Sequence, residues 1–300
     1  MIGSEKGMAL VLTLLIMSLL TAMVVEFVYN VYTTNAGLNN WREAQKLSLV
    51  AKSGISLATK IISENQSRYS YTYPGSVEIP VANILKGFSG KVVIRVVDEN
   101  SKFNLNSLVY PNGTINETAF NSFIRLLKNL HLDENIADRV ADWIDLDLEP
   151  RIMDSEEGAK NYYLDSVDEL LLVKGSDSQT YDKLSPLVTV YGISQVYNNL
   201  ININTATRDV IMSLDDAITE TLAERVINYR ALEPFTGVSD LVKVAGFEGA
   251  LGQSLMNKIT VKAANLRITS VAAEGPVKRI IECVIAVKEN RLFIEYWQET

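Results

Sequence analysis

The stretch that decides the fold is residues 8–25, MALVLTLLIMSLLTAMVV, which contain no charged residue, glycine or proline. At about 1.5 Å of rise per residue, a helix of this length is roughly 27 Å long, close to the ~30 Å hydrocarbon core of a bilayer. Lys6 is the only basic side chain before the stretch, and the next basic residue after it is Arg42. This asymmetry favours an N-terminus in the cytoplasm. We therefore expect one membrane-spanning helix.

The same helix should continue well past the membrane. From Met8 to Ile62 there is no proline, and the only glycines are Gly37 and Gly54, so a single helix of about 80 Å is expected. No A-x-A-like cleavage site follows the apolar stretch, which argues against a secretory signal peptide. Beyond the bilayer, apolar and small residues recur at three- and four-residue steps, which predicts packing on a soluble body. These residues are Trp41, Ala44, Leu47, Ala51, Gly54, Ile55, Ala58 and Ile62.

Composition excludes several classes of protein. The 300 residues include one cysteine, Cys283, and one histidine, His131, so we expect neither an internal disulfide nor a Cys/His zinc site. The net charge of −8 provides no positive field for phosphate backbones, so we expect no nucleic-acid partner. No nucleophile with a nearby base and no phosphate-binding loop stands out, so we expect a protein that is not an enzyme.

The body reads as α+β with an antiparallel sheet. Residues 91–98, KVVIRVVD, predict a strong strand and residues 77–82 a weaker one, after a loop over 64–76 that contains Pro74-Gly75. Three more strands are expected at 266–272, 277–287 and 291–297, separated by turns at 274–276 and 289–290. The simplest packing closes this sheet over the long helix, with residues 101–261 inserted between its strands.

The inserted segment contains an internal repeat. Residues 103–106, FNLN, match 201–204, ININ, and similar matches follow to the end of each copy, at about 101–191 and 199–261. In each copy we expect an Asn-x-Asn segment that caps a helix, two further helices, and a leucine-rich helix that ends at a glycine. The second copy resembles a helix-hairpin-helix module, but Gly246 has apolar and acidic neighbours. We therefore favour a packing module over DNA binding.

An acidic segment distinguishes the first copy. The distance from Arg139 to Val167 is fifteen residues longer than the matching distance from Arg225 to Val238. Calcium prefers six to eight oxygen ligands on a flexible loop, and alternating carboxylates can point several oxygens at one place, although Pro150 excludes an EF-hand. The alternative is an acidic loop that is simply solvated. The candidate ligands are Asp142, Asp145, Asp147, Glu149, Asp154, Glu156 and Glu157.

These features together resemble a known family. The polar leader that ends in Gly7, directly before the spanning helix, resembles that of type IV prepilins and pseudopilins. The run Asp-Trp-Ile-Asp-Leu-Asp-Leu-Glu-Pro at 142–150, followed by Gly158-Ala159 and two tyrosines, resembles the minor pseudopilin K family of type II secretion. Most pilins carry glutamate at the fifth mature position. Here that position is Leu12, a departure shared with family K.

The resemblance implies an organisation and a processing step. It implies a leader at 1–7, a transmembrane helix at 8–25, a pilin-like α+β domain at 26–100 and 262–300, and an inserted helical domain at 101–261. A prepilin peptidase would cut after Gly7, and Met8 would become the methylated N-terminus.

The resemblance also implies a location and a role. The chain would cross the inner membrane once, with its N-terminus in the cytoplasm and its bulk in the periplasm. It would cap the pseudopilus tip with minor pseudopilins I and J, help to start assembly of the major pseudopilin filament, contact exported cargo, and bind at least one calcium ion. The alternatives are a minor pilin of a type IV pilus and a membrane-anchored helix-hairpin-helix protein that handles DNA.

Overall fold

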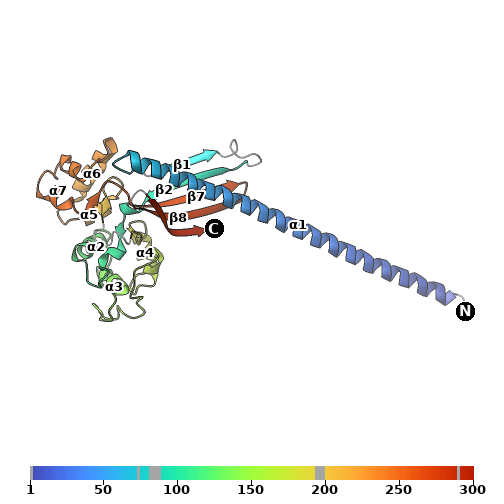
Figure 1. Cartoon of the computed structure of the whole chain (residues 1–300). Coiled ribbons are helices and arrows are strands. Elements are labelled where there is room, and N and C mark those ends of the chain that lie inside the picture. The colour runs from blue at the N-terminus through green and yellow to red at the C-terminus, as the bar shows by residue number, and fades with distance from the viewer. Residues whose placement is uncertain (1–2, 73–74, 81–88, 193–199, 289–290) are drawn as a thin grey trace.

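One helix, α1 (Gly3–Arg68), runs unbroken through 66 residues, and its last third lies on a sheet while the rest projects from the body (Figure 1). At 1.5 Å per residue it is about 99 Å long. The computed structural model describes residues 3–72, 75–80, 89–192, 200–288 and 291–300. Within them, α1 is the one helix long and apolar enough to cross a membrane. The expected long N-terminal helix is therefore confirmed.

The helix differs from the prediction at two places. It continues to Arg68, so Glu64–Arg68, which we expected to lie in a loop, is helical. Buried Gln66 holds this last turn, because its Nε2 donates to the Ala263 carbonyl at 2.9 Å. The prediction that Trp41 packs on the body is also wrong: its side chain is 61% exposed, and burial begins at Leu47. Periodicity identifies the apolar side of a helix but not where the sheet beneath it begins.

Five antiparallel strands form the sheet in the order β1-β2-β7-β8-β9. The central pair, β2 and β7, is joined across the whole helical insertion. The three C-terminal strands are confirmed, each slightly longer than expected, and with α1 they confirm the α+β class. Ala82, Pro74 and the predicted turn at 289–290 lie outside the described residues. The strands are β1 (Gly75–Pro80), β2 (Lys91–Asp98), β7 (Asn265–Glu274), β8 (Val277–Lys288) and β9 (Arg291–Glu299).

A close approach between α1 and β7 holds the helix on the sheet. Gly54 is buried, and a Cβ at this position would lie 2.3 Å from the Ser270 hydroxyl oxygen and 3.2 Å from a Val92 methyl. The helix can therefore lie close to β7 only because this position has no side chain. Around this point the apolar side of α1 and the facing strands form one core. Its larger members include Leu47, Ile55, Ile62, Ile94, Ile268, Ile281 and Ile285.

The insertion between β2 and β7 folds as two small helical units in series. The first contains η2 (Glu99–Ser101), β3 (Phe103–Asn104), η3 (Leu105–Leu108), α2 (Glu117–Asn129), α3 (Asn135–Ile144), η4 (Val167–Leu171), α4 (Ser178–Leu184) and β4 (Val188–Thr189). The second contains β5 (Ile201–Asn202), α5 (Arg208–Ser213), α6 (Glu220–Leu232), η6 (Val238–Lys243), α7 (Ala250–Leu255) and β6 (Ile259–Thr260). In each unit the first and last short strands pair in parallel.

Equivalent asparagines lock the two units. In the first, the side chain of Asn106 accepts from the Leu164 amide and donates to the Leu164 and Val190 carbonyls. In the second, Asn204 accepts from the Phe235 amide and donates to the Phe235 carbonyl, both at 2.9 Å. The second asparagine of each Asn-x-Asn motif thus ties the middle of its unit to the start. The leucine-rich segments form 3-10 turns, η4 and η6, rather than α-helices.

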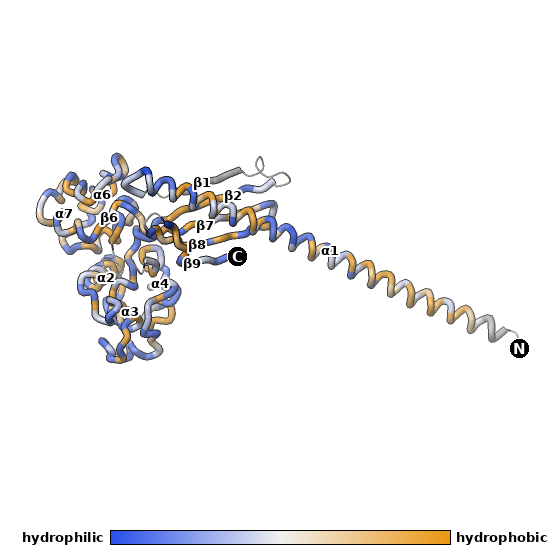
Figure 2. Tube along the Cα trace, viewed as in Figure 1, coloured by the Kyte–Doolittle hydropathy of each residue, from blue (hydrophilic) through white to orange (hydrophobic). Residues whose placement is uncertain are grey.

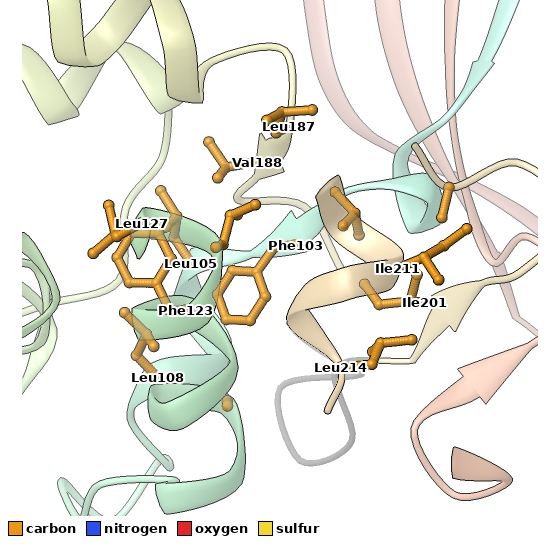
Figure 3. Close-up of a cluster of buried hydrophobic side chains, with 14 of the residues drawn as sticks. Phe103, Leu105, Leu108, Phe123, Leu127, Leu187, Val188, Ile201, Ile211 and Leu214 are labelled. Atoms are coloured by element: carbon orange, nitrogen blue, oxygen red, sulfur yellow. The ribbon is translucent and has the colours of Figure 1, made fainter. Parts of the chain in front are cut away.

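The two units share one hydrophobic core. Phe103 and Phe123 stack with ring centroids 5.3 Å apart in the first unit, and Ile201 and Ile211 belong to the same buried cluster from the second (Figure 3). Because this cluster is separate from the core beneath α1, the body has two apolar centres. A polar segment at the end of β2 connects them.

Three consecutive polar residues form this connection. Asp98 accepts from Asn202 Nδ2 and the Thr205 hydroxyl of the second unit, both at 2.7 Å. Glu99 accepts from the Thr189 hydroxyl of the first unit at 2.5 Å. The third residue, Asn100, accepts from the backbone amides of Ala264 and Asn265, at the start of β7. Each of the three residues therefore fixes a different part of the body.

The pKa values of the two carboxyl groups in this connection are shifted in opposite directions. Burial raises the pKa of Asp98 to about 6, against the lowering effect of its hydrogen bonds. Burial also opposes the charge of Glu99, but Lys102 and Arg267 lower its pKa below the ordinary value. The Nε of Arg267 lies 2.6 Å from Glu99 Oε1, so strand β7 contributes a cation to the connection.

Gly54→Leu tests the close approach of α1 to the sheet. The added side chain must displace β7 or lift the helix, and overpacking of this kind costs about 1–3 kcal/mol of unfolding free energy. We expect a lower urea midpoint for the detergent-solubilised chain. The matched control is Gly37→Leu, on the same helix, where a Cβ meets nothing within 4 Å. Equal midpoints for the two variants would contradict this packing.

Candidate metal centre

The acidic segment forms a loop between α3 and η4, where the second unit has only a short connection. Its two ends are held close together, because the Tyr162 amide donates to the Trp143 carbonyl at 3.4 Å and the Trp143 indole donates to Glu169. The backbone inside the loop is tightly turned, with positive φ at Asp154, Gly158 and Asn161. The chain therefore leaves α3, turns back on itself, and returns beside the point where it left.

Three of the seven candidate ligands converge. One carboxylate oxygen from each of Asp145, Asp147 and Glu156 lies within 4.8 Å of the others. Two oxygens on opposite sides of a calcium ion are about 4.8 Å apart, since each lies about 2.4 Å from the ion. The Oδ1 atom of Asp145 and both carboxylate oxygens of Glu156 are buried and have no hydrogen-bond partner among the described residues. This combination of crowding and missing partners is what a cation would relieve.

The pKa values follow from this crowding. Burial, followed by repulsion from Asp147, Asp142 and Glu156, raises the pKa of Asp145 to about 7. Burial and then the charges of Asp142 and Asp147 raise the pKa of Glu156. Without a cation, a proton on Asp145 near neutral pH relieves part of the repulsion.

A fourth acidic residue, Asp142, is completely buried and holds the loop from beneath. It accepts from the Arg151 amide at 2.8 Å and from the Ser155 hydroxyl, and the Arg151 side chain lies 3.3 Å from its Oδ1 atom. These contacts pull the middle of the loop onto the end of α3. Asp142 therefore positions the cluster and is itself engaged with Arg151 and Ser155.

The other three candidates lie apart from the cluster. Asp154 and Glu157 both pair with Lys174, at 3.4 and 2.7 Å. Glu149 is exposed, and its backbone amide donates to Asp147 Oδ1 at 2.9 Å. Its backbone therefore orients a ligand candidate, whereas its side chain faces solvent.

Sequence reasoning missed one residue of this site, Asn161. Its Nδ2 donates to the Asp147 carbonyl at 2.9 Å, while its Oδ1 is buried and meets no hydrogen-bond donor in the part of the chain that the structure describes. An amide oxygen is a ligand type that calcium accepts. The sequence offers only a weak signal for this residue, because asparagine tolerates the positive φ required at this turn but tolerance of a turn does not indicate a ligand. The adjacent Lys160 is engaged with Asp165 and Glu169.

The predicted processing residues lie at the far end of the molecule. Gly7 and Met8 are consecutive residues of α1, both exposed, and a Cβ at Gly7 would meet nothing within 4 Å. Residues 3–6 belong to the same helix, so the described part of the leader continues into the apolar segment without a break.

Comparisons with known proteins match the helical insertion in sequence and most of the chain in fold. Two family models, both described as type II secretion system protein K, match residues 101–192 and 201–262, which together make up just over half of the chain. A curated relative, type II secretion system protein K of Pseudomonas aeruginosa, is 31% identical over 172 residues. That match covers 51% of this chain and 49% of the relative, so it spans about half the length of the relative.

A solved structure matches over more of the chain. It is one chain of the GspK-GspI-GspJ complex of the enterotoxigenic Escherichia coli type 2 secretion system, with a TM-score of 0.68 and 20% identity. The match covers 87% of this chain and 98% of that one. At this identity the likeness concerns the fold alone.

The raised pKa of Asp145 predicts a pH-dependent stability difference. A carboxyl with a folded pKa of about 7 and an unfolded value near 3.8 stabilises the fold below pH 4, and loses that contribution as pH rises to about 7. In excess chelator, Asp145→Asn should therefore gain melting temperature relative to the unsubstituted chain as pH rises from 5 to 8. Exposed Glu149→Gln serves as the control and should show a constant difference. A constant difference for Asp145→Asn as well would mean that the carboxyl is not held in this environment.

Proposed function

This chain belongs to the type II secretion system protein K family, and we propose that it is a minor pseudopilin that caps the tip of the pseudopilus and helps to start its assembly. The observation that carries the proposal is the combination of a membrane-length N-terminal helix with a helical insertion far larger than the sheet that bears it. The role is structural: the chain organises other subunits for protein export across the outer membrane.

The proposed placement in the cell follows from α1. The apolar segment crosses the inner membrane once, with the N-terminus in the cytoplasm and the body in the periplasm. Prepilin peptidase cuts between Gly7 and Met8, and Met8 becomes the methylated N-terminus. The exposure of both residues on a bare helix, without a covering element among the described residues, supports access by the peptidase.

Two features support a position at the tip. Leu12 cannot neutralise the terminal amine of a neighbouring subunit in a filament core, so nothing compensates for that charge if this chain sits within the stack. The insertion leaves the sheet between β2 and β7 and forms a body wider than the sheet itself (Figure 1). A tightly wound shaft has to exclude such bulk, whereas an end can accept it.

We further propose minor pseudopilins I and J as direct partners, with the major pseudopilin filament below them. The support is that the solved structure with the similar fold is a chain of a GspK-GspI-GspJ complex. Exported cargo is a proposed further contact of the insertion at the tip.

The DNA-handling alternative loses its phosphate site. A helix-hairpin-helix module needs free backbone amides at its glycine turn. Here the Gly246 amide donates to the carboxylate of Glu248 at 2.7 Å, and the backbone amides of Glu248 itself and of Gly246 lower the pKa of that carboxyl. In the first unit the matching acidic residue, Asp177, accepts from the Thr180 amide. In the second unit an internal anion therefore takes the glycine-turn amide that a phosphate would need, and in the first unit the acidic residue caps α4.

Calcium is the proposed ligand of the acidic loop. Asp145, Asp147 and Glu156 would hold it, with the Asn161 amide oxygen as a further ligand, because their oxygens are hard, close together and partly without partners. Bound calcium would supply positive charge that draws the two ends of the loop together. Asp142 and Arg151 keep the loop folded toward α3 in either state.

The position and processing can be tested on filaments assembled with prepilin peptidase and the other pseudopilins. Gold-labelled antibodies against residues 101–261 should mark one end of each filament, and the N-terminal residue of the incorporated chain should be Met8. Gly7→Val should block both incorporation and the appearance of Met8. Gold along the shaft would instead favour a minor pilin built into the filament body.

Calcium should stabilise the body by binding only the folded state. At a concentration a hundredfold above the dissociation constant, the gain is about 2.7 kcal/mol, so chelation should lower the melting temperature by several degrees. Asp145→Ala with Asp147→Ala should remove the difference. The control, Asp154→Ala with Glu157→Ala, removes two acidic residues that pair with Lys174 and should retain it. Identical melting curves with calcium and with chelator would leave a solvated acidic loop as the explanation.

A further inference from the structure

A cavity lies where α1 ends, between the sheet and the second helical unit. Its volume is about 340 Å³, within the range of about 300–1,000 Å³ that is usual for small-ligand pockets. The end of α1 lies beside the insertion (Figure 1), so the cavity is at a junction of two packed bodies, where ligand pockets are common. Its described lining residues are Ile62, Asn65, Gln66, Tyr69, Tyr71, Thr72, Val96 and Leu266.

Hydrogen bonds hold the walls of this cavity in place. Gln66 donates through its Nε2 to the Ala263 carbonyl, and its own backbone carbonyl accepts from the Lys262 ammonium at 2.6 Å. The Thr72 amide donates to the Val261 carbonyl at 3.1 Å, and the Thr72 hydroxyl oxygen accepts from the Ala263 amide at 2.8 Å. Two lining residues are therefore tied to the same short segment after the second unit, which fixes the shape of the cavity.

The lining is neutral and of mixed polarity. Ile62 and Leu266 belong to the core beneath α1 and Val96 packs against it, so these three provide an apolar floor. Figure 2 shows the last turns of α1 as largely hydrophilic beside the more hydrophobic strand β7. None of the eight described lining residues carries a charge. Because an ionic ligand would lose hydration here without gaining a counter-charge, the cavity favours a neutral molecule.

Several polar groups in the cavity are available to such a molecule. Gln66 is buried and uses its Nε2 for Ala263, while no donor among the described residues reaches its Oε1. The Thr72 hydroxyl accepts one hydrogen bond and can donate its own proton to a ligand. The Asn65 side chain is exposed and offers both a donor and an acceptor. A matching ligand therefore carries hydroxyl and amide groups at several positions around an apolar centre.

Two tyrosines add a flat apolar surface at the opening. The rings of Tyr69 and Tyr71 have centroids 6.0 Å apart and planes tilted by 46°, and Tyr69 is 51% exposed. An exposed aromatic ring offers an apolar face beside a polar edge. A sugar ring has the same division, with C–H groups on its face and hydroxyls around its edge. An acetamido substituent would add a methyl group for the apolar floor and an N–H for the Gln66 Oε1.

We propose that this cavity binds an N-acetylated sugar unit of a neutral glycan, with the sugar ring against Tyr69 and the acetamido group directed to Gln66. At ~30 Å³ per water molecule, the cavity holds roughly eleven waters, which is room for one substituted ring. A half-exposed site for one ring gives a dissociation constant on the order of millimolar. The site shares no residue with the acidic loop, and its failure would leave the proposed function standing.

Ligand-observed NMR on the full chain, in a detergent without a sugar headgroup, tests the choice of ligand. The probes are N-acetylglucosamine, its β-1,4-linked trimer, and glucosamine, in which a charged amine replaces the acetamido group. We expect saturation transfer to the acetamido methyl and the ring C–H protons of N-acetylglucosamine, at least equal affinity for the trimer, and at least tenfold weaker binding of glucosamine. Exclusion of the trimer would overturn the assignment to a glycan. Tighter binding of the neutral peptide analogue N-acetylproline methylamide would replace the sugar by a peptide.

Substitutions test the place of binding. Tyr69→Ala and Asn65→Ala alter exposed lining residues, so both variants should keep the melting temperature of the unsubstituted chain. We expect Tyr69→Ala to weaken N-acetylglucosamine binding at least tenfold and Asn65→Ala to weaken it severalfold. The control is Tyr162→Ala, which removes an equally exposed tyrosine from the acidic loop and should leave binding unchanged. If the unsubstituted chain binds no sugar at millimolar concentration, or if both lining variants bind normally, the inference is wrong.

Discussion

The arrangement of the body depends on two adjacent carboxylates, Asp98 and Glu99, at the point where β2 leaves the sheet. Adjacent side chains at the end of a strand point in different directions, and each carboxylate meets a different helical unit. Glu99 also receives Arg267 from β7, so one residue joins the sheet and the first unit. Ion pairs and hydrogen bonds need defined geometry, whereas apolar contacts do not. A polar connection between two apolar cores therefore fixes the orientation of the insertion as well as its attachment.

The acidic loop shows how similar residues acquire different tasks from their surroundings. Asp142 is neutralised by Arg151 and serves as a support, while Asp154 and Glu157 share Lys174 at the rim. Asp145 and Glu156 are left with burial and mutual repulsion, and among the described residues nothing donates a hydrogen bond to Oδ1 of Asp145 or to either carboxylate oxygen of Glu156. Uncompensated charge in such a place costs free energy. The loop is therefore destabilised locally by this repulsion. A divalent cation bound between the carboxylates would remove the repulsion and connect the two ends of the loop.

Regular elements were predictable from the sequence because their signals are local. The uncharged run in α1, the alternation in β2 and the C-terminal strands all depend on neighbouring residues. How much of α1 the sheet covers was not predictable. Trp41 continues the helical pattern of Leu47, but the sheet does not reach it. In the loop, the seven acidic residues could not be ranked as ligands from the sequence. Their spacing does not show that Arg151 pairs with Asp142 or that Lys174 pairs with two others. Asn161 was missed because its contribution depends on where its amide oxygen points, which no spacing rule reports.

The pairing of β2 with β7 has a consequence for the order of folding. These strands form the centre of the sheet, yet residues 99–264 separate them. Closing a flexible loop of this length costs about 4–5 kcal/mol of chain entropy beyond a constant. Once the insertion has folded, Thr189 and Asn202 lie beside Glu99 and Asp98, and the loop that remains is short. Until then the edge of β2 that β7 will cover stays open, and it can pair with other molecules. Substitutions that destabilise the helical units would therefore appear first as aggregation through β2, a strand that lies outside those units.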